Sequence, residues 1–135
     1  MTTGARLLDI PKVEDPRGNL SFIQNGADCL PFKLRRVYWI YDVPGGRERD
    51  GHAFRRGEEL IVALSGSFDV ALRGADGSEE RVHLCRSYYG LHVPAMTWRS
   101  LENFSTNSVA MILSSVTYAP DDYIDDYQQY RDEAR

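Results

Sequence analysis

Short strand-like runs, separated by turn residues and without helical spacing between them, make up most of this chain. The runs ELIVALS (59–65), SFDVALR (67–73) and SVAMILSSV (108–116) are typical, and GADG (74–77) is a strong tight-turn signal. We expect the first two runs to pair as a hairpin. Strands this short and this closely spaced indicate an all-β sandwich or barrel. With 135 residues, we expect a single domain spanning residues 1–135.

Two segments near the N-terminus carry further strand signals. DPRGN (15–19) is a dense turn signal that joins two short strand-like runs as a hairpin would. In the run 32–43, Arg36, Tyr38 and Ile40 share one face, whereas Val37 and Trp39 lie on the other. This alternation indicates a strand that borders a polar cavity or solvent.

The C-terminal segment changes its period. Asp121 and Asp122 follow Pro120 and are plausible N-terminal caps. Four apolar or aromatic residues then recur at helical spacing, namely Tyr123, Ile124, Tyr127 and Tyr130. We predict one short helix here, with its tyrosines attaching it to the outside of the barrel.

Composition excludes several classes of protein. Basic residues are outnumbered, with a net charge of -4, and no nucleic-acid-binding motif is present, so we expect no nucleic-acid partner. No apolar run is long enough to span a membrane, and the first residues lack the layout of a signal peptide. Cys29 and Cys85 belong to no CxxC pair, and we interpret both as free thiols of a cytoplasmic protein.

The stretch from residue 46 to residue 66 carries a recognisable spacing. Five residues separate Gly46 from His52, one separates His52 from Phe54, four separate Phe54 from Glu59, and six separate Glu59 from Gly66. This spacing resembles the first cupin motif, with Phe54 where a second metal-binding histidine usually stands. The resemblance implies a single cupin, or jelly-roll, β-barrel with the short C-terminal helix outside it.

The second cupin motif is similar but also altered. Pro94 and Asn103 stand at the motif spacing, and Arg99 occupies the histidine position. His52 and Glu59 alone cannot supply the three or four ligands of a transition metal, and a guanidinium beside them repels a cation. We therefore predict no metal.

His52 has two interpretations. It is either a histidine packed in the barrel wall or a general acid–base group, for which its ordinary pKa is suited. Arg36, Tyr38, Arg49 and Arg99 can border the same cavity, and arginines favour phosphate or carboxylate ligands. This set suits an anionic substrate with an exchangeable proton next to a carbonyl.

Other residues are weaker candidates. His83 has the alternation of a solvent-facing strand position, and His92 is ambiguous. Trp98, next to Arg99, is able to stack on a base or a sugar, although an aromatic residue in a β-protein usually serves only packing.

With these residues in view, the chain resembles the cupin-type sugar-nucleotide 3,4-ketoisomerases over nearly its whole length. DPRGNLSFI, PFKLRRVYWIYDVP and RDGHAF resemble the first hairpin, the following strand and the histidine motif of that family. LSGSFDVALRGADG, YYGLHVPAMTW and YAPDDYIDDYQQY resemble its later strands and its acidic, tyrosine-rich tail.

The resemblance implies an activity. Members convert dTDP-4-keto-6-deoxyglucose to a 3-keto-6-deoxyhexose by moving a proton from C3 to C4 through an enediol, without a cofactor, and their products feed deoxyamino sugars of surface polysaccharides. It also implies a homodimer that exchanges N-terminal strands. His52 matches the base, Tyr38 a site tyrosine, and Arg36 and Arg49 the residues at the sugar-phosphate end.

The departures from the family pattern leave alternatives open. Arg99 is able to stabilise the enediolate, so we group it with His52 and Tyr38 as catalytic. We group the other candidates as substrate-binding residues, namely Arg36, Arg49, Trp98, Phe54 and Glu59. A 3,5-epimerase-like cupin acting on the same substrate and a non-catalytic sugar-nucleotide-binding cupin are the alternatives, and the replacements at Phe54 and Arg99 favour the second. The configuration of the product at C4 stays open.

Overall fold

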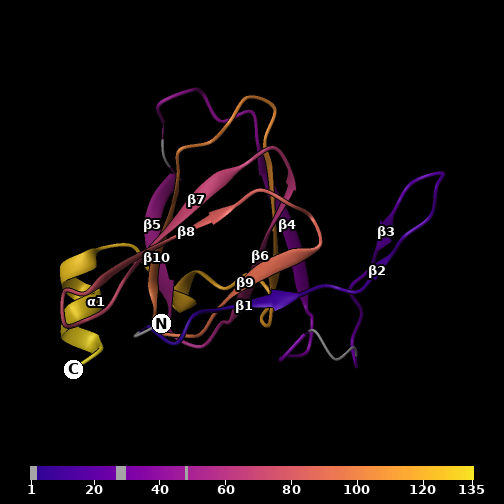
Figure 1. Cartoon of the computed structure of the whole chain (residues 1–135). Helices are drawn as coiled ribbons and strands as arrows, with labels where there is room; N and C mark the ends of the chain where they lie inside the picture. The colour runs from indigo at the N-terminus through magenta and orange to yellow at the C-terminus, as the bar shows by residue number, and fades with distance from the viewer. Residues whose placement is uncertain (1–2, 27–29, 48) are drawn as a thin grey trace.

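A computed structural model describes residues 3–26, 30–47 and 49–135, whose strands form two facing antiparallel sheets and a separate hairpin (Figure 1). The first sheet has the order β1 (Arg6–Asp9), β9 (Tyr89–Val93), β6 (Glu59–Ser65), β11 (Val109–Ser114), β4 (Arg36–Tyr41). The second sheet has the order β12 (Tyr123–Ile124), β5 (Arg49–Phe54), β10 (Trp98–Glu102), β7 (Phe68–Arg73), β8 (Glu79–Leu84). The hairpin consists of β2 (Lys12–Val13) and β3 (Leu20–Ser21). The expected all-β class is confirmed.

The main core lies between the two sheets. Apolar residues of both inner faces meet there and are fully buried, including Ile61, Leu91 and Ile112 of the first sheet and Phe68, Val70 and Leu101 of the second. Removal of this apolar surface from water is the main force that holds the sheets together.

Strand β4 shows the alternation expected from its sequence. Arg36, Tyr38 and Ile40 are half-buried, and Tyr38 and Ile40 pack against the main core. Val37 and Trp39 are exposed on the outer face. The predicted two-faced strand is confirmed, with its polar face directed between the sheets.

The predicted pairing of residues 59–65 with residues 67–73 is wrong. β6 lies between β9 and β11 in the first sheet, whereas β7 lies between β10 and β8 in the second. The chain passes from one sheet to the other at Gly66, whose φ of +67° is a conformation that side chains rarely adopt. Residues 74–77 do form a tight turn, which joins β7 to β8.

The predicted turn at residues 15–19 is confirmed, since the Gly18 N–H donates to the Asp15 carbonyl over 2.9 Å. It joins β2 to β3, whereas β1 pairs with β9 in the first sheet. The β2–β3 hairpin projects away from the two sheets (Figure 1). Its apolar residues Val13 and Leu20 are exposed.

The C-terminal helix is shorter than predicted. Residues 120–122 form a 3₁₀ turn, η1 (Pro120–Asp122), and Tyr123–Ile124 is the strand β12 at the edge of the second sheet. Helix α1 (Tyr127–Glu133) begins only after Asp126, whose side chain accepts from the Gln129 N–H. The prediction that Asp121 and Asp122 cap the helix is therefore wrong, while the single short helix outside the sheets is confirmed for the described residues (Figure 1).

Cys85 is a free thiol, and Cys29 lies outside the described residues. Among the residues that the structure describes, no helix has the length and apolar character needed to cross a membrane.

Close strand packing at Gly90 predicts a stability defect. A Cβ at this position lies 2.9 Å from the main-chain oxygen of Ile61 on the neighbouring β6. We expect Gly90→Ala to lower the free energy of unfolding by about 1–3 kcal/mol, because a backbone atom cannot move aside easily. Denaturant unfolding measures this change. Gly45→Ala is the matched control, since no atom lies within 4 Å of its added Cβ; equal stability of the two variants contradicts the packing described.

Candidate functional site

Predicted site residues from four strands meet at one end of the space between the sheets. They are Arg36 and Tyr38 of β4, His52 and Phe54 of β5, Glu59 of β6 and Arg99 of β10. Strand alternation explains the arrangement: Ala53 and Trp98 pack on the outer face of the second sheet, so their neighbours point inward. We call these six residues the inner cluster.

A buried ion pair forms the base of the inner cluster. The Nε and Nη2 atoms of Arg99 lie 3.0 and 2.8 Å from Oε1 of Glu59, and both side chains are only 1% exposed. Nη2 of Arg99 also donates to the Tyr38 hydroxyl over 3.0 Å, and that hydroxyl donates to Oε2 of Glu59. The pair therefore ties β10 of the second sheet to β6 and β4 of the first.

The ion pair sets the protonation of its members. Burial and the neighbouring Glu59 carboxylate raise the pKa of the Tyr38 phenol, so this phenol stays neutral. Burial opposes the charge of Arg99, but Glu59 and Tyr38 outweigh it and raise the pKa of the guanidinium. The cluster thus holds a permanent cation beside a neutral phenol.

Arg99 retains one donor group for a ligand. Its Nη1 atom is buried and has no hydrogen-bond partner among the described residues. Buried donors in proteins are usually bonded, so an open one points to a group that binds there. Arg99 and His52 are direct partners across the β10–β5 pair, so their side chains leave neighbouring strands next to each other. A proton acceptor next to a fixed cationic donor can remove a proton and stabilise the resulting oxyanion.

Aromatic rings surround His52. Its ring centroid lies 4.8 Å from that of Phe54 and 5.1 Å from that of Tyr123. The Tyr123 hydroxyl accepts a hydrogen bond from Nη2 of Arg36 over 3.3 Å. The Arg36 guanidinium also lies 4.8 Å from the Tyr38 ring centroid. Phe54 thus fills the second histidine position with an apolar ring that packs against His52.

Tyr123 is a site residue that the sequence analysis missed. The spacing of its segment predicts a helix, in which Tyr123 and Tyr127 share one face. Alternation over 122–124 was the available signal, because Asp122 and Ile124 are buried on either side of a residue that points to the cluster.

Two predicted residues are not part of the inner cluster. Trp98 lies on the opposite face of β10 and packs against Tyr127 and Tyr130, with centroid distances of 5.4 and 5.9 Å. Because neighbouring residues of a strand point to opposite faces, Trp98 does not face the inner cluster with Arg99. Its role in binding a base or a sugar stays a prediction. The backbone of Arg49 begins β5, but its side chain lies outside the described residues.

The other histidines have structural partners. The His83 side chain is 54% exposed, as predicted, and its Nδ1 lies 2.6 Å from an Asp69 oxygen. His92 is buried, with its Nε2 atom 2.9 Å from a Glu58 oxygen.

The residues of the inner cluster fit a metal poorly. Both oxygens of Glu59 are bonded to Arg99 or Tyr38. The described residues contain no group of three or more potential histidine, cysteine or carboxylate ligands. The absence of a metal in the working protein stays a prediction.

Comparison with known proteins gives the family. The model of the family described as FdtA, WxcM-like, C-terminal matches residues 3–135. The chain belongs to this family.

Relatives of known activity resemble the chain over nearly its full length. The TDP-4-oxo-6-deoxy-α-D-glucose-3,4-oxoisomerase of Aneurinibacillus thermoaerophilus is 32% identical over 126 residues, which cover 93% of this chain and 89% of the relative. The 3,4-ketoisomerase QdtA of Thermoanaerobacterium thermosaccharolyticum, solved as a histidine-to-asparagine variant with TDP-4-keto-6-deoxyglucose, has 29% identity and a TM-score of 0.93, covering 99% and 96% of the two chains. The WlaRB TDP-quinovose 3,4-ketoisomerase of Campylobacter jejuni has 29% identity and a TM-score of 0.89, covering 96% and 98%. The expected jelly-roll fold is confirmed by these likenesses.

The raised pKa of Tyr38 predicts a pH dependence of stability. An exposed tyrosine ionises near pH 10. Above this pH, Tyr38 ionises in the unfolded chain but stays neutral in the folded protein, so the unfolded state is stabilised relative to the folded state. The stability linked to this proton is present below about pH 10 and is lost as the pH rises. We expect the free energy of unfolding to fall less steeply between about pH 9 and about pH 11 in Tyr38→Phe than in the parent.

Urea unfolding across this pH range measures the effect. Tyr41→Phe, on the exposed outer face of the same strand, is the matched control. Identical slopes for the parent and Tyr38→Phe contradict the description of Tyr38 as a buried neutral phenol.

Proposed function

We propose that this protein is a sugar-nucleotide 3,4-ketoisomerase that converts TDP-4-keto-6-deoxyglucose to a TDP-linked 3-keto-6-deoxyhexose. The observation that carries the proposal is the pairing of His52 with Arg99 on neighbouring strands, together with the open Nη1 of Arg99. The family membership and the TDP-sugar 3,4-ketoisomerase relatives support it.

In the proposed reaction, His52 takes the proton from C3 of the hexose. The electron pair of that C–H bond forms a C3–C4 double bond, and the C4 carbonyl becomes the oxygen of an enediolate. The C3 hydroxyl proton then passes to O4, which becomes a hydroxyl. The oxyanion left at O3 re-forms a carbonyl as the C3–C4 double-bond pair takes a proton at C4 from the imidazolium, whose proton exchanges with solvent. No cofactor is needed, because the adjacent carbonyl already acidifies the C3–H bond.

Arg99 is proposed to bind the enediolate oxygen through Nη1. Its other nitrogens are held by Glu59 and Tyr38, so the donor is fixed before the charge develops. Tyr38 is proposed to act as a neutral phenol that orients Arg99, because its proton is donated to Glu59. Glu59 therefore serves the site by holding these two residues.

Arg36 and Arg49 are proposed to bind the diphosphate end of the substrate. Arg36 is half-buried, and Arg49 precedes His52 on β5. A guanidinium can grip a phosphate with two hydrogen bonds. Phe54 is proposed to contact the hexose as an apolar wall next to His52.

The wider setting is also proposed. The catalytic domain is proposed to span residues 1–135, and the match of the family model to residues 3–135 supports this. We place the enzyme in the cytoplasm, consistent with a free thiol at Cys85, and its product in deoxyamino-sugar synthesis for surface polysaccharide.

A homodimer with exchanged N-terminal strands is part of the proposal. The outer face of the first sheet exposes Val37, Trp39, Tyr41 and Leu64, of which Trp39 is 59% exposed. The β2–β3 hairpin projects beyond the sheets with exposed apolar residues, and an isolated two-stranded hairpin is marginally stable in water (Figure 1). A second copy of the chain that receives the hairpin and covers this face accounts for both features.

The reaction is tested by NMR in D₂O with TDP-4-keto-6-deoxyglucose. We expect the ketone to move from C4 to C3 and one solvent deuteron to appear at C4. His52→Asn should lower this rate by about 10²–10⁴-fold with TDP affinity nearly unchanged, because it removes the proton acceptor.

His83→Asn is the matched control, since it changes an exposed histidine on the outer face of the second sheet. Deuterium at C3 or C5 with an unmoved ketone indicates an epimerase, and an unmoved ketone without label indicates a binding protein. Retention of more than about a tenth of the rate in His52→Asn contradicts its role as the base.

The dimer is tested by sedimentation of the parent and of Trp39→Glu. We expect a dimer for the parent at micromolar concentration and at least a tenfold weaker association for the variant, because it buries a charge in an apolar interface. Gln128→Glu adds the same charge on the exposed side of α1 and should leave the dimer intact. A monomeric parent, or equal association of the two variants, rules out this interface.

A further inference from the structure

The C-terminal segment contributes a side chain to the inner cluster from the edge of the second sheet. β12 pairs with β5 so that Tyr123 lies opposite Phe54 and Ile124 lies opposite Ala53. The Tyr123 ring packs against Phe54, with centroids 4.6 Å apart, and against His52 at 5.1 Å. Its hydroxyl is bonded to Arg36 of the opposite sheet. Tyr123 therefore contacts both the proposed base and a proposed phosphate ligand.

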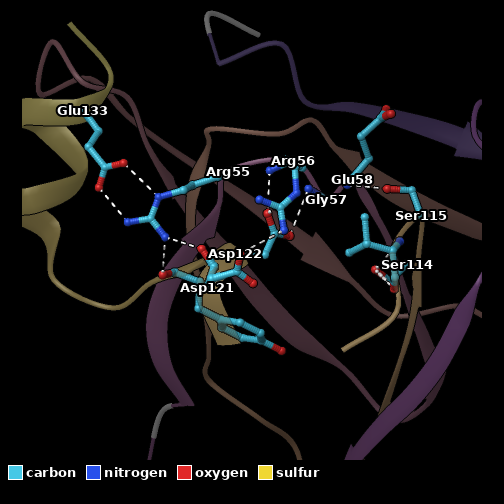
Figure 2. A network of polar contacts seen from close by, with 11 residues as sticks. Arg55, Arg56, Gly57, Glu58, Ser114, Ser115, Asp121, Asp122 and Glu133 are labelled. Atoms are coloured by element: carbon cyan, nitrogen blue, oxygen red, sulfur yellow. Dashed lines mark hydrogen bonds and ion pairs between the residues drawn. The ribbon is translucent and has the colours of Figure 1, made fainter. Parts of the chain in front are cut away.

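A strand of two residues needs support beyond its own pairing, and Asp122 provides it. The carboxylate of Asp122 is 1% exposed and accepts the N–H groups of Arg56 (2.7 Å) and Gly57 (3.2 Å), as Figure 2 shows. Nε of Arg56 lies 3.7 Å from the same carboxylate. A buried carboxylate without such partners is strongly unfavourable, so these bonds fix the position of the residue before Tyr123.

Arg55 holds the segment from its other side. Its guanidinium donates to both carboxylate oxygens of Glu133, each over 2.9 Å, and to the main-chain oxygens of Asp121 and Tyr123 (Figure 2). Residues 55–58 join β5 to β6, the strands that carry His52 and Glu59. The connection that fixes the position of these two strands therefore also fixes the position of Tyr123.

We propose that Tyr123 is a positioning residue of the active site and that Asp122 is its anchor. The ring of Tyr123, together with Phe54, fixes the plane of the His52 imidazole, and the hydroxyl fixes the Arg36 guanidinium. This inference rests on the proposed ketoisomerase activity for its kinetic consequences. The packing of the Tyr123 ring against His52, on which the inference is built, does not depend on that activity.

Two substitutions at Tyr123 separate the ring from the hydroxyl. Tyr123→Phe keeps the ring and loses the bond to Arg36, so TDP should bind about two- to tenfold more weakly while kcat stays within about threefold of the parent. Tyr123→Leu loses both groups, so TDP affinity should fall as in Tyr123→Phe and kcat should fall about 10²-fold, because a misplaced base lowers the rate steeply. If Tyr123 served stability alone, the two variants would not differ in kcat while having the same TDP affinity.

Asp122→Asn tests the anchor against Asp121→Asn. Asp122 is buried, whereas the Asp121 side chain is 78% exposed and makes only an ion pair with Arg56. We expect Asp122→Asn to lower kcat at least tenfold and Asp121→Asn to leave it unchanged. If Asp122→Asn does not fold, the two Tyr123 variants still decide the proposal.

A spectroscopic measurement is independent of the reaction. The chain has three histidines, and of these His52 alone has a ring contact with Tyr123 among the described contacts. Tyr123→Leu should therefore shift the ring proton NMR signals of His52, through loss of the ring current, while those of His83 and His92 stay in place.

Shifted His52 signals without isomerase activity in the parent contradict the proposed function but support the positioning role. Unshifted His52 signals, or a kcat of Tyr123→Leu within threefold of the parent, overturn the positioning role. An equally low kcat in Tyr123→Phe and Tyr123→Leu also overturns it, because the ring is then not the group that acts.

Discussion

The buried ion pair between Arg99 and Glu59 is the interaction on which the site depends. It joins the two sheets at the end of the core, in a region where neither side chain is accessible to water. Burial of two charges is expensive unless their donors and acceptors form hydrogen bonds. The Tyr38 hydroxyl bonds to both partners, since it accepts from Arg99 and donates to Glu59. One Arg99 nitrogen alone is left open for a ligand, as far as the described residues show.

This arrangement explains how a cupin framework can work with an altered motif. Glu59 keeps its motif position but serves Arg99, which stands where the second motif has a histidine. Phe54 stands where the first motif has its second histidine, and it packs against His52. In the proposed reaction, this fixed guanidinium stabilises the developing oxyanion, and His52 is the proposed proton acceptor beside it.

The sequence predicted most of the inner cluster because motif spacing and strand alternation both operate over a few residues. Alternation placed Arg36 and Tyr38 on one face, and the motif placed His52 and Glu59 on consecutive strands of the chain. Alternation also places Trp98 and Arg99 on opposite faces of β10, so it separates Trp98 from the inner cluster.

These short-range patterns do not predict which strands pair or which distant residues are in contact. The runs at β6 and β7 adjoin in sequence but lie in different sheets, because apolar content does not specify which strands pair. Tyr123 and Tyr127 are four residues apart, a spacing that suits a helix, yet the bonds of Asp122 to residues 56 and 57 hold Tyr123 in a strand. Tertiary contacts therefore overrode the local pattern.

The most direct test of the central claim is a crystal structure of the His52→Asn variant with TDP-4-keto-6-deoxyglucose bound. We expect C3 of the hexose within about 3.5 Å of the side chain at position 52 and O4 within hydrogen-bond distance of Nη1 of Arg99. A hexose bound outside the two sheets, or a phosphate in place of O4 at Nη1, contradicts the account.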